Sequence, residues 1–142
     1  MRKLKGQINV FEQVMLFLIS VLIFLACLMA FSSYQQYFIS TGNSDQLVLV
    51  RDYIAYSIIK ASEAGNETES YTTLYIPKVI GSETYIIRLS PAGLTLDMPF
   101  SKETKSTNLY GIGSSMELGT SDVSSSYGRV ILYKDGNKII IT

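Results

Sequence analysis

The chain has few residues able to do chemistry. Its 142 residues include no histidine, the side chain that most often serves as a general base at neutral pH. The single cysteine, Cys27, lies inside an apolar run, so the rest of the chain has no thiol nucleophile, disulfide or cysteine zinc site. The serine clusters at residues 114–115 and 124–126 have no histidine to activate them. We therefore expect no enzyme activity, no cofactor and no metal site.

Two other groups of polar residues could be modified or could bind a ligand. Asn66-Glu67-Thr68 is an N-glycosylation tripeptide, so Asn66 is a candidate glycan acceptor if this part of the chain is outside the cell. The acidic residues lack the spacing of a calcium loop, and we interpret them as a solvated surface. Their total of 12 is balanced by 12 Lys or Arg, which argues against a nucleic-acid partner.

Residues 14–31, VMLFLISVLIFLACLMAF, carry no charge and are long enough to cross a bilayer as a helix. A secretory signal peptide is the alternative, but it would have a shorter apolar core and a small-residue cleavage site, which residues 31–34 do not resemble. Arg2, Lys3 and Lys5 precede the run, and the next basic residue is Arg51. This bias predicts a single-pass protein in the cell membrane, with a cytoplasmic N-terminus and an extracellular C-terminal domain.

A second helical pattern follows the apolar run. One helix could extend from residue 8 to residue 62, or it could kink or break at Gly42-Asn43. Gly65-Asn66 is expected to end the pattern, because both residues favour a left-handed cap. Between residues 46 and 61, apolar residues recur at intervals of three and four, as in an amphipathic helix: Leu47, Val50, Ile54, Ile58 and Ala61.

From Tyr71 onward the pattern is that of β-strands. Strands are expected at residues 73–77, 84–89 and 94–98, with turns at 81–82 and 91–93. Asp135-Gly136-Asn137 lies between apolar runs at 129–134 and 138–141, which predicts a hairpin. Residues 109–118 are expected to hold one or two short strands, and residues 101–107 and 119–128 are expected to be loops.

These elements predict an α+β fold. A long N-terminal helix, first transmembrane and then amphipathic, would pack on a small antiparallel sheet of five or six strands. The predicted segments are a cytoplasmic basic tip at 1–6, a transmembrane helix at 7–38, an amphipathic helix at 39–64 and an extracellular β-rich domain at 65–142. Because the same helix would enter the membrane and cover the sheet, we expect anchor and domain to be one mechanical unit.

This arrangement resembles that of type IV pilins. Lys5-Gly6-Gln7, preceded by basic residues, is similar to the site in archaeal class III signal peptides where prepilin peptidase cuts after the glycine. Residues 76–87, IPKVIGSETYII, resemble a pattern found in small archaeal envelope proteins with pilin-like N-termini. The resemblance implies cleavage between Gly6 and Gln7, a pilin-like fold, and packing of the N-terminal helix against membrane lipid and other pilin-like subunits.

Glu12 departs from the pattern of this family. In such pilins a glutamate usually lies fifth in the mature chain and neutralises the N-terminus of a neighbouring subunit during assembly. After cleavage at Gly6, Phe11 would be fifth and Glu12 sixth, which turns the side chain by about 100° on a helix. Glu12 either still serves assembly or is a hydrated residue near Lys5.

The resemblance therefore predicts a subunit or minor component of an archaeal type IV pilus-like assembly. The alternative is an uncleaved, membrane-anchored protein whose outer domain binds a surface-layer or archaellum protein.

Overall fold

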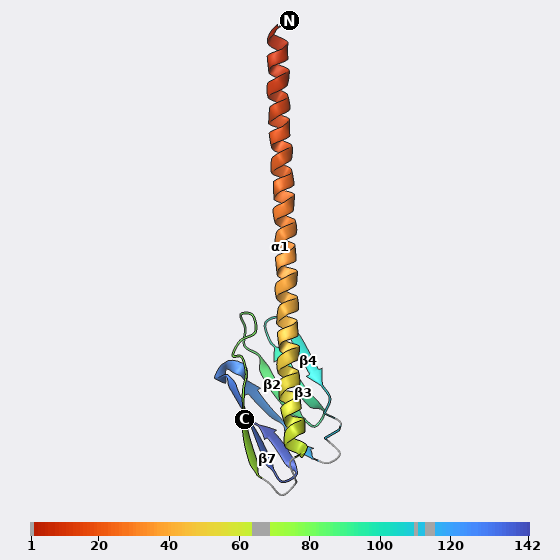
Figure 1. The fold of residues 1–142 in the computed structure, drawn as a ribbon, viewed down its shortest axis with the longest axis vertical. Coiled ribbons are helices and arrows are strands. Elements are labelled where there is room, and N and C mark those ends of the chain that lie inside the picture. The colour runs from red at the N-terminus through yellow and green to blue at the C-terminus, as the bar shows by residue number, and fades with distance from the viewer. Residues whose placement is uncertain (1, 64–68, 110, 113–115) are drawn as a thin grey trace. The chain divides into compact units, whose positions relative to one another are not determined.

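A computed structural model describes residues 2–63, 69–109, 111–112 and 116–142, with side chains from residue 9 onward. Within these residues lie one α-helix, one 3-10 helix and eight strands (Figure 1). The chain divides into two compact units, Met1–Ser40 and Thr41–Thr142. The long helix begins in the first unit and ends in the second.

This helix, α1 (Arg2–Glu63), continues through Gly42-Asn43, so the break that the sequence left open is not present. Apart from the adjacent residues and the neighbouring turns of its own helix backbone, no described atom lies within 4 Å of the position that a Cβ on Gly42 would occupy, so packing does not require a glycine there. α1 ends at Glu63. The expected cap at Gly65-Asn66 lies outside the described residues.

The first sheet has the strand order β1-β7-β8-β5. β1 and β8 run antiparallel to β7, whereas the two-residue β5 runs parallel to β8. The predicted hairpin is confirmed, although Asp135 still pairs with Lys138 and the loop consists of Gly136 (φ 54°) and Asn137. The strands are β1 (Ser70–Tyr75), β5 (Glu117–Leu118), β7 (Arg129–Asp135) and β8 (Lys138–Ile141).

The second sheet has the order β4-β3-β2-β6 and is antiparallel throughout. Its β2–β3 hairpin turns at Pro91-Ala92, and Ser90 pairs with Gly93. Gly93 has a φ of 136°, and a Cβ there would lie 2.2 Å from the Thr107 carbonyl oxygen, so the turn requires glycine. The strands are β2 (Ile86–Ser90), β3 (Gly93–Met98), β4 (Glu103–Thr107) and β6 (Ser121–Ser124).

Both loop predictions were wrong. Residues 103–107, ETKST, form β4, an edge strand without an apolar residue that pairs with β3 through its backbone. The serine-rich stretch contains β6 and the 3-10 helix η1 (Ser125–Tyr127), with Val123 as the one buried apolar side chain of β6. The predicted single sheet of five or six strands is therefore two sheets of four, because these polar segments complete the second sheet.

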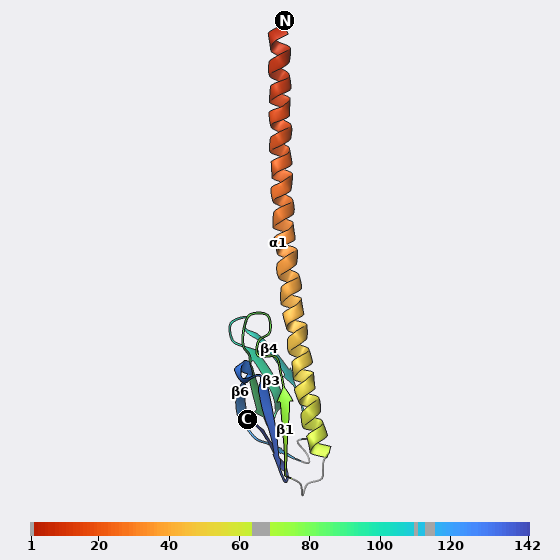
Figure 2. The same cartoon turned by 60° about the vertical axis from the view of Figure 1, so that its left-hand side comes forward.

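One hydrophobic cluster connects α1 with both sheets. The predicted helical stripe is confirmed, since Leu47, Val50, Ile54 and Ile58 are buried and Ala61 packs against the cluster. Leu132 and Ile139 contribute from the first sheet, and Leu89 and Leu96 from the second. The unit Thr41–Thr142 thus packs the end of α1 against an antiparallel-rich β domain, as expected for an α+β fold (Figure 2).

Candidate functional site

The apolar segment of α1 exposes its side chains. Every residue from 9 to 42 is exposed, including large side chains such as Phe17 at 67% and Phe24 at 62%. By length and composition, α1 could cross a membrane. Leaving so much contiguous apolar surface in water is unfavourable, so this segment requires an apolar environment or an apolar partner.

The polar side chains inside this segment are compatible with such an environment. The Ser20 hydroxyl donates a hydrogen bond to the Leu16 carbonyl at 2.8 Å, and the Ser33 hydroxyl donates one to the Met29 carbonyl at 3.1 Å. Each bond lies within the helix, so neither hydroxyl needs a water molecule or a second chain. The free thiol of Cys27 is exposed on the same segment.

Of the predicted site residues, only Glu12 has a described side chain. It is exposed, directly after Phe11, which is 68% exposed. Among the side chains that the structure describes, from residue 9 onward, none forms a hydrogen bond or an ion pair with the Glu12 carboxylate. The backbone of Gly6 and Gln7 lies within α1, but the surroundings of these two residues are not described. Asn66 lies outside the described residues.

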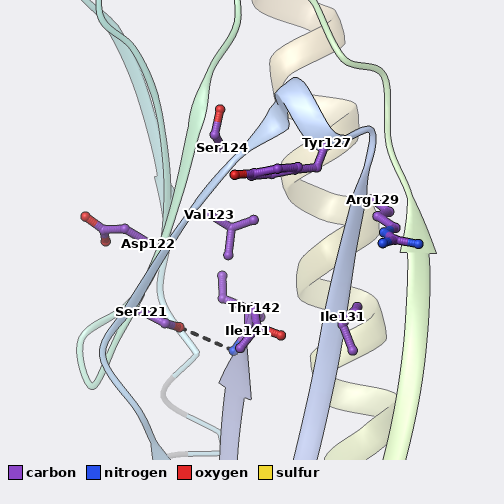
Figure 3. Close-up of a pocket in the computed structure, with 9 residues that line it drawn as sticks. All are labelled: Ser121, Asp122, Val123, Ser124, Tyr127, Arg129, Ile131, Ile141 and Thr142. Carbon is purple, nitrogen blue, oxygen red and sulfur yellow. Dashed lines mark hydrogen bonds between the residues drawn. The ribbon is translucent and has the colours of Figure 1, made fainter.

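An open groove of about 480 Å³ lies among β6, β7 and β8 (Figure 3). The Tyr127 ring lies across one end of it, and the side chains of Val123 and Ile131 contribute apolar surface. Ser121 Oγ accepts a hydrogen bond from the Ile141 amide at 3.3 Å. Asp122 forms an ion pair with Arg88 at 3.5 Å. The lining can therefore hold a small apolar group, and its described residues do not include a nucleophile paired with a base.

A buried polar cluster beside η1 has a structural role. Ser125 Oγ accepts a hydrogen bond from the Tyr85 amide at 2.9 Å and donates one to the Lys78 carbonyl at 2.8 Å. The Tyr85 hydroxyl donates to the Pro77 carbonyl at 2.7 Å, and burial raises the pKa of Tyr85. Ser125 is fully buried and engaged in both directions, so it is not placed to act as a nucleophile.

Polar contacts also connect α1 to the edge strand β4. Arg51 Nη1 donates to the Ser106 carbonyl at 3.3 Å. A hydrogen bond with Ser44 lowers the pKa of Glu103, and Lys105, 3.2 Å from the carboxylate, lowers it further. Among the residues that the structure describes, no group of three or more His, Cys, Asp or Glu side chains could hold a metal ion.

Sequence reasoning missed both the groove and the Ser125 cluster. Their residues come from segments far apart in the chain, and pairing in the sheets brings them together. The only local signal was the serine run at 124–126, whose hydroxyls instead cap η1 and satisfy buried backbone groups.

In comparisons with known proteins, no family model, no curated protein and no solved structure matches the chain.

Proposed function

We propose that this chain is a pilin-like cell-surface protein, a non-catalytic subunit or minor component of an archaeal type IV pilus-like assembly. The supporting observation is the division of α1. Residues 9–42 are uncovered and largely apolar, whereas the stripe from Leu47 to Ile58 is built into the core of a β domain. One helix thus offers an anchoring segment and carries a folded domain at its other end.

The uncovered segment suits membrane lipid before assembly and neighbouring helices after it. A helix that is apolar on all sides belongs in a bilayer or among other helices. Arg2, Lys3 and Lys5 before the span favour a cytoplasmic N-terminus. Residues 65–142 would then be outside the cell, where Asn66 could carry a glycan.

Glu12 supports assembly because none of the side chains described from residue 9 onward is its partner. An ionised carboxylate in hydrocarbon costs several kcal/mol unless it is paired. Cleavage by prepilin peptidase after Gly6 would create a new amino group at Gln7, and the amino group of a neighbouring subunit is a fitting partner for Glu12.

The second candidate function is that of an uncleaved single-pass anchor whose outer domain binds a surface-layer or archaellum protein. The observation that favours it is the position of Glu12, which lies sixth rather than fifth after the Gly6-Gln7 junction. On a helix this offset turns the carboxylate by about 100° from the usual assembly position.

The intact mass of protein from native membranes separates these functions. A processed subunit begins at Gln7, and Gly6→Val should leave the leader attached. Gly42→Val is a matched control, because it changes a glycine of the same helix in open space and should not affect processing. A wild-type chain that begins at Met1, with Gly6→Val differing from it only by the mass of the substitution itself, would exclude processing.

Shearing filaments from cells then tests assembly. Glu12→Gln removes the charge but keeps the shape, so processed protein should remain in the membrane and be depleted from the sheared fraction. Asp45→Asn, at an exposed position of α1, controls for the loss of one negative charge. If wild-type protein also stays entirely in the membrane, it is an anchor or a minor component rather than a filament subunit.

A further inference from the structure

β1 is an edge strand, and half of its backbone groups point away from its sheet. The Ile76 amide donates a hydrogen bond to the Gly128 carbonyl at 3.2 Å. These two residues lie two positions beyond the Leu74–Val130 pair in the same register. In an antiparallel ladder, hydrogen-bonded pairs alternate with non-bonded pairs. The even-numbered residues of β1 therefore bond to β7, whereas the N–H and C=O groups of Tyr71, Thr73 and Tyr75 face the free edge.

These outward groups have no partner among the residues that the structure describes. The side chains of the same three residues are also exposed, Tyr71 at 71% and Tyr75 at 78%. Tyr71 stacks on Tyr133 of β7 with the ring centroids 4.5 Å apart, which stiffens the strand from its outer face. β1 thus presents a row of donors and acceptors that no described residue occupies.

Within the part of the chain that the structure describes, β1 also lacks the features that usually protect an edge strand. Edge strands commonly carry charges or proline, or are covered by another element. β4 has such protection, since it contains Glu103 and Lys105 and Arg51 of α1 binds the Ser106 carbonyl. β1 reads SYTTLY, with no charged residue and no proline.

A groove of about 520 Å³ lies between this edge and α1, which run side by side (Figure 2). Ser70 and Thr72 line it from β1, and Tyr53, Tyr56 and Lys60 are among the residues that line it from α1. Ser70 and Thr72 lie on the same face of β1 as the buried Leu74. A strand added at the free edge would therefore place every second side chain over this groove.

We propose that the free edge of β1 binds an extended segment of another polypeptide by strand addition. The backbone groups of Tyr71, Thr73 and Tyr75 would form the new ladder, and the groove would receive alternate side chains. The tyrosine walls suit small apolar side chains. Among the described residues that line the groove, Lys60 is the charged one, so it favours a segment with an acidic side chain beside it.

A second copy of this chain fits the edge less well than a separate polypeptide. β1 has no acidic residue to place beside Lys60. Pairing of the edge with a second copy is therefore one of the outcomes that the test below distinguishes.

Binding of short fluorescent peptides to the full chain in lipid nanodiscs tests the proposal. The probes alternate Val and Thr and carry one Glu, Gln or Lys at each position in turn, with fluorescence anisotropy as the readout. We expect the best Glu peptide to bind about tenfold more tightly than its Lys counterpart. Lys60→Glu should reverse this preference, which a nonspecific apolar contact would not do.

Thr73 offers a matched pair of variants for the backbone contact. Thr73→Pro removes an outward N–H without removing a bond to β7, whereas Thr73→Ala keeps that N–H. We expect Thr73→Pro to weaken peptide binding at least about tenfold and Thr73→Ala to change it less than about twofold. Thermal unfolding of both variants shows whether the domain is still folded.

Three results would overturn the proposal: no peptide of the set binds, a folded Thr73→Pro variant binds as well as wild type, or the chain self-associates through β1 so that Thr73→Pro makes it monomeric. The last result would make a second copy the occupant. Failure of the chain to insert into membranes would refute the proposed anchoring instead, and peptide binding would remain a separate measurement.

Discussion

At Ser125 one hydroxyl satisfies two backbone groups, the Tyr85 amide and the Lys78 carbonyl. Ser125→Ala leaves both without this partner in a buried site, and a buried polar group that loses its hydrogen bond costs about 1–3 kcal/mol. We therefore expect the free energy of unfolding to fall by about 2 kcal/mol. Urea unfolding of the full chain in detergent micelles measures this change.

Ser126→Ala is the matched control for that measurement. Ser126 is exposed, and its hydroxyl forms a hydrogen bond with Ser124 Oγ at 2.9 Å. Exposed substitutions usually change stability by less than about 0.5 kcal/mol. An equal fall in the free energy of unfolding in both variants would show that the buried hydrogen bonds of Ser125 do not contribute as expected.

Tyr85 makes stability depend on alkaline pH. Its pKa is raised by burial above its usual value of about 10. The neutral phenol is therefore favoured in the folded state, and its contribution is complete below about pH 10 and is lost as pH rises toward the folded pKa. Tyr85→Phe should flatten this alkaline decline and, by removing the bond to Pro77, lower stability at neutral pH by about 1 kcal/mol.

Urea unfolding at a series of pH values checks the prediction for Tyr85. Tyr133 contributes in the same direction, because its hydrogen bond with Tyr71 raises its pKa to about 12. Some alkaline decline should therefore remain in Tyr85→Phe and should diminish further when Tyr133→Phe is added. An alkaline decline that is identical in wild type and Tyr85→Phe would contradict the assignment.

At the scale of elements, Gly42 is a point where α1 is weaker than it needs to be. A glycine inside a helix costs roughly 0.5–1 kcal/mol relative to alanine, and a Cβ at Gly42 would meet no described atom within 4 Å beyond its own stretch of helix backbone. Gly42→Ala should therefore stabilise α1 by roughly that amount. Thermal unfolding by circular dichroism at 222 nm measures the change.

Gly93→Ala is the contrasting variant. Its Cβ would meet the Thr107 carbonyl oxygen at 2.2 Å, and its φ of 136° disfavours any other residue. This substitution should lower stability while Gly42→Ala raises it. If Gly42→Ala destabilises the chain instead, the glycine serves a bend or a contact with another subunit.

The elements also show which predictions local sequence could support. The hydrophobic stripe from Leu47 to Ile58 and the hairpins at Pro91-Ala92 and Gly136-Asn137 were visible, because their signals lie within a few residues. β4 and β6 were not predicted, because their mostly polar sequences show no alternation of apolar and polar residues. They are strands because their backbones pair with β3 and β2, respectively.

For the whole molecule, the proposed anchor predicts how the protein behaves in membranes. Each arginine at the centre of a transmembrane helix costs about 2.5–3.5 kcal/mol of insertion free energy. Leu22→Arg together with Leu25→Arg should therefore shift the chain out of the membrane fraction that resists alkaline carbonate extraction. Tyr56→Arg, at an exposed position on the domain, should leave the chain in that fraction.

Protease added to intact cells tests the orientation in the same experiment. The wild-type domain should be cleaved and the N-terminal tip protected, because Arg2, Lys3 and Lys5 favour the cytoplasmic side. A protected domain with an accessible tip would reverse the topology.

The sequence by itself determined the candidate anchor, the helix that follows it and most of the hairpins. These properties depend on the composition of one segment and on the spacing of its apolar residues. Neither changes when the chain folds. The Gly6-Gln7 junction and Glu12 are also matters of local sequence, and their roles remain predictions.

The tertiary structure decided the features that depend on residues far apart in the chain. It divided the strands into two sheets, placed Ser125 beside Tyr85, and put β1 at the edge of its sheet next to α1. Whether a strand is central or at an edge depends on which strands pair, and pairing is set by the whole core rather than by any one segment.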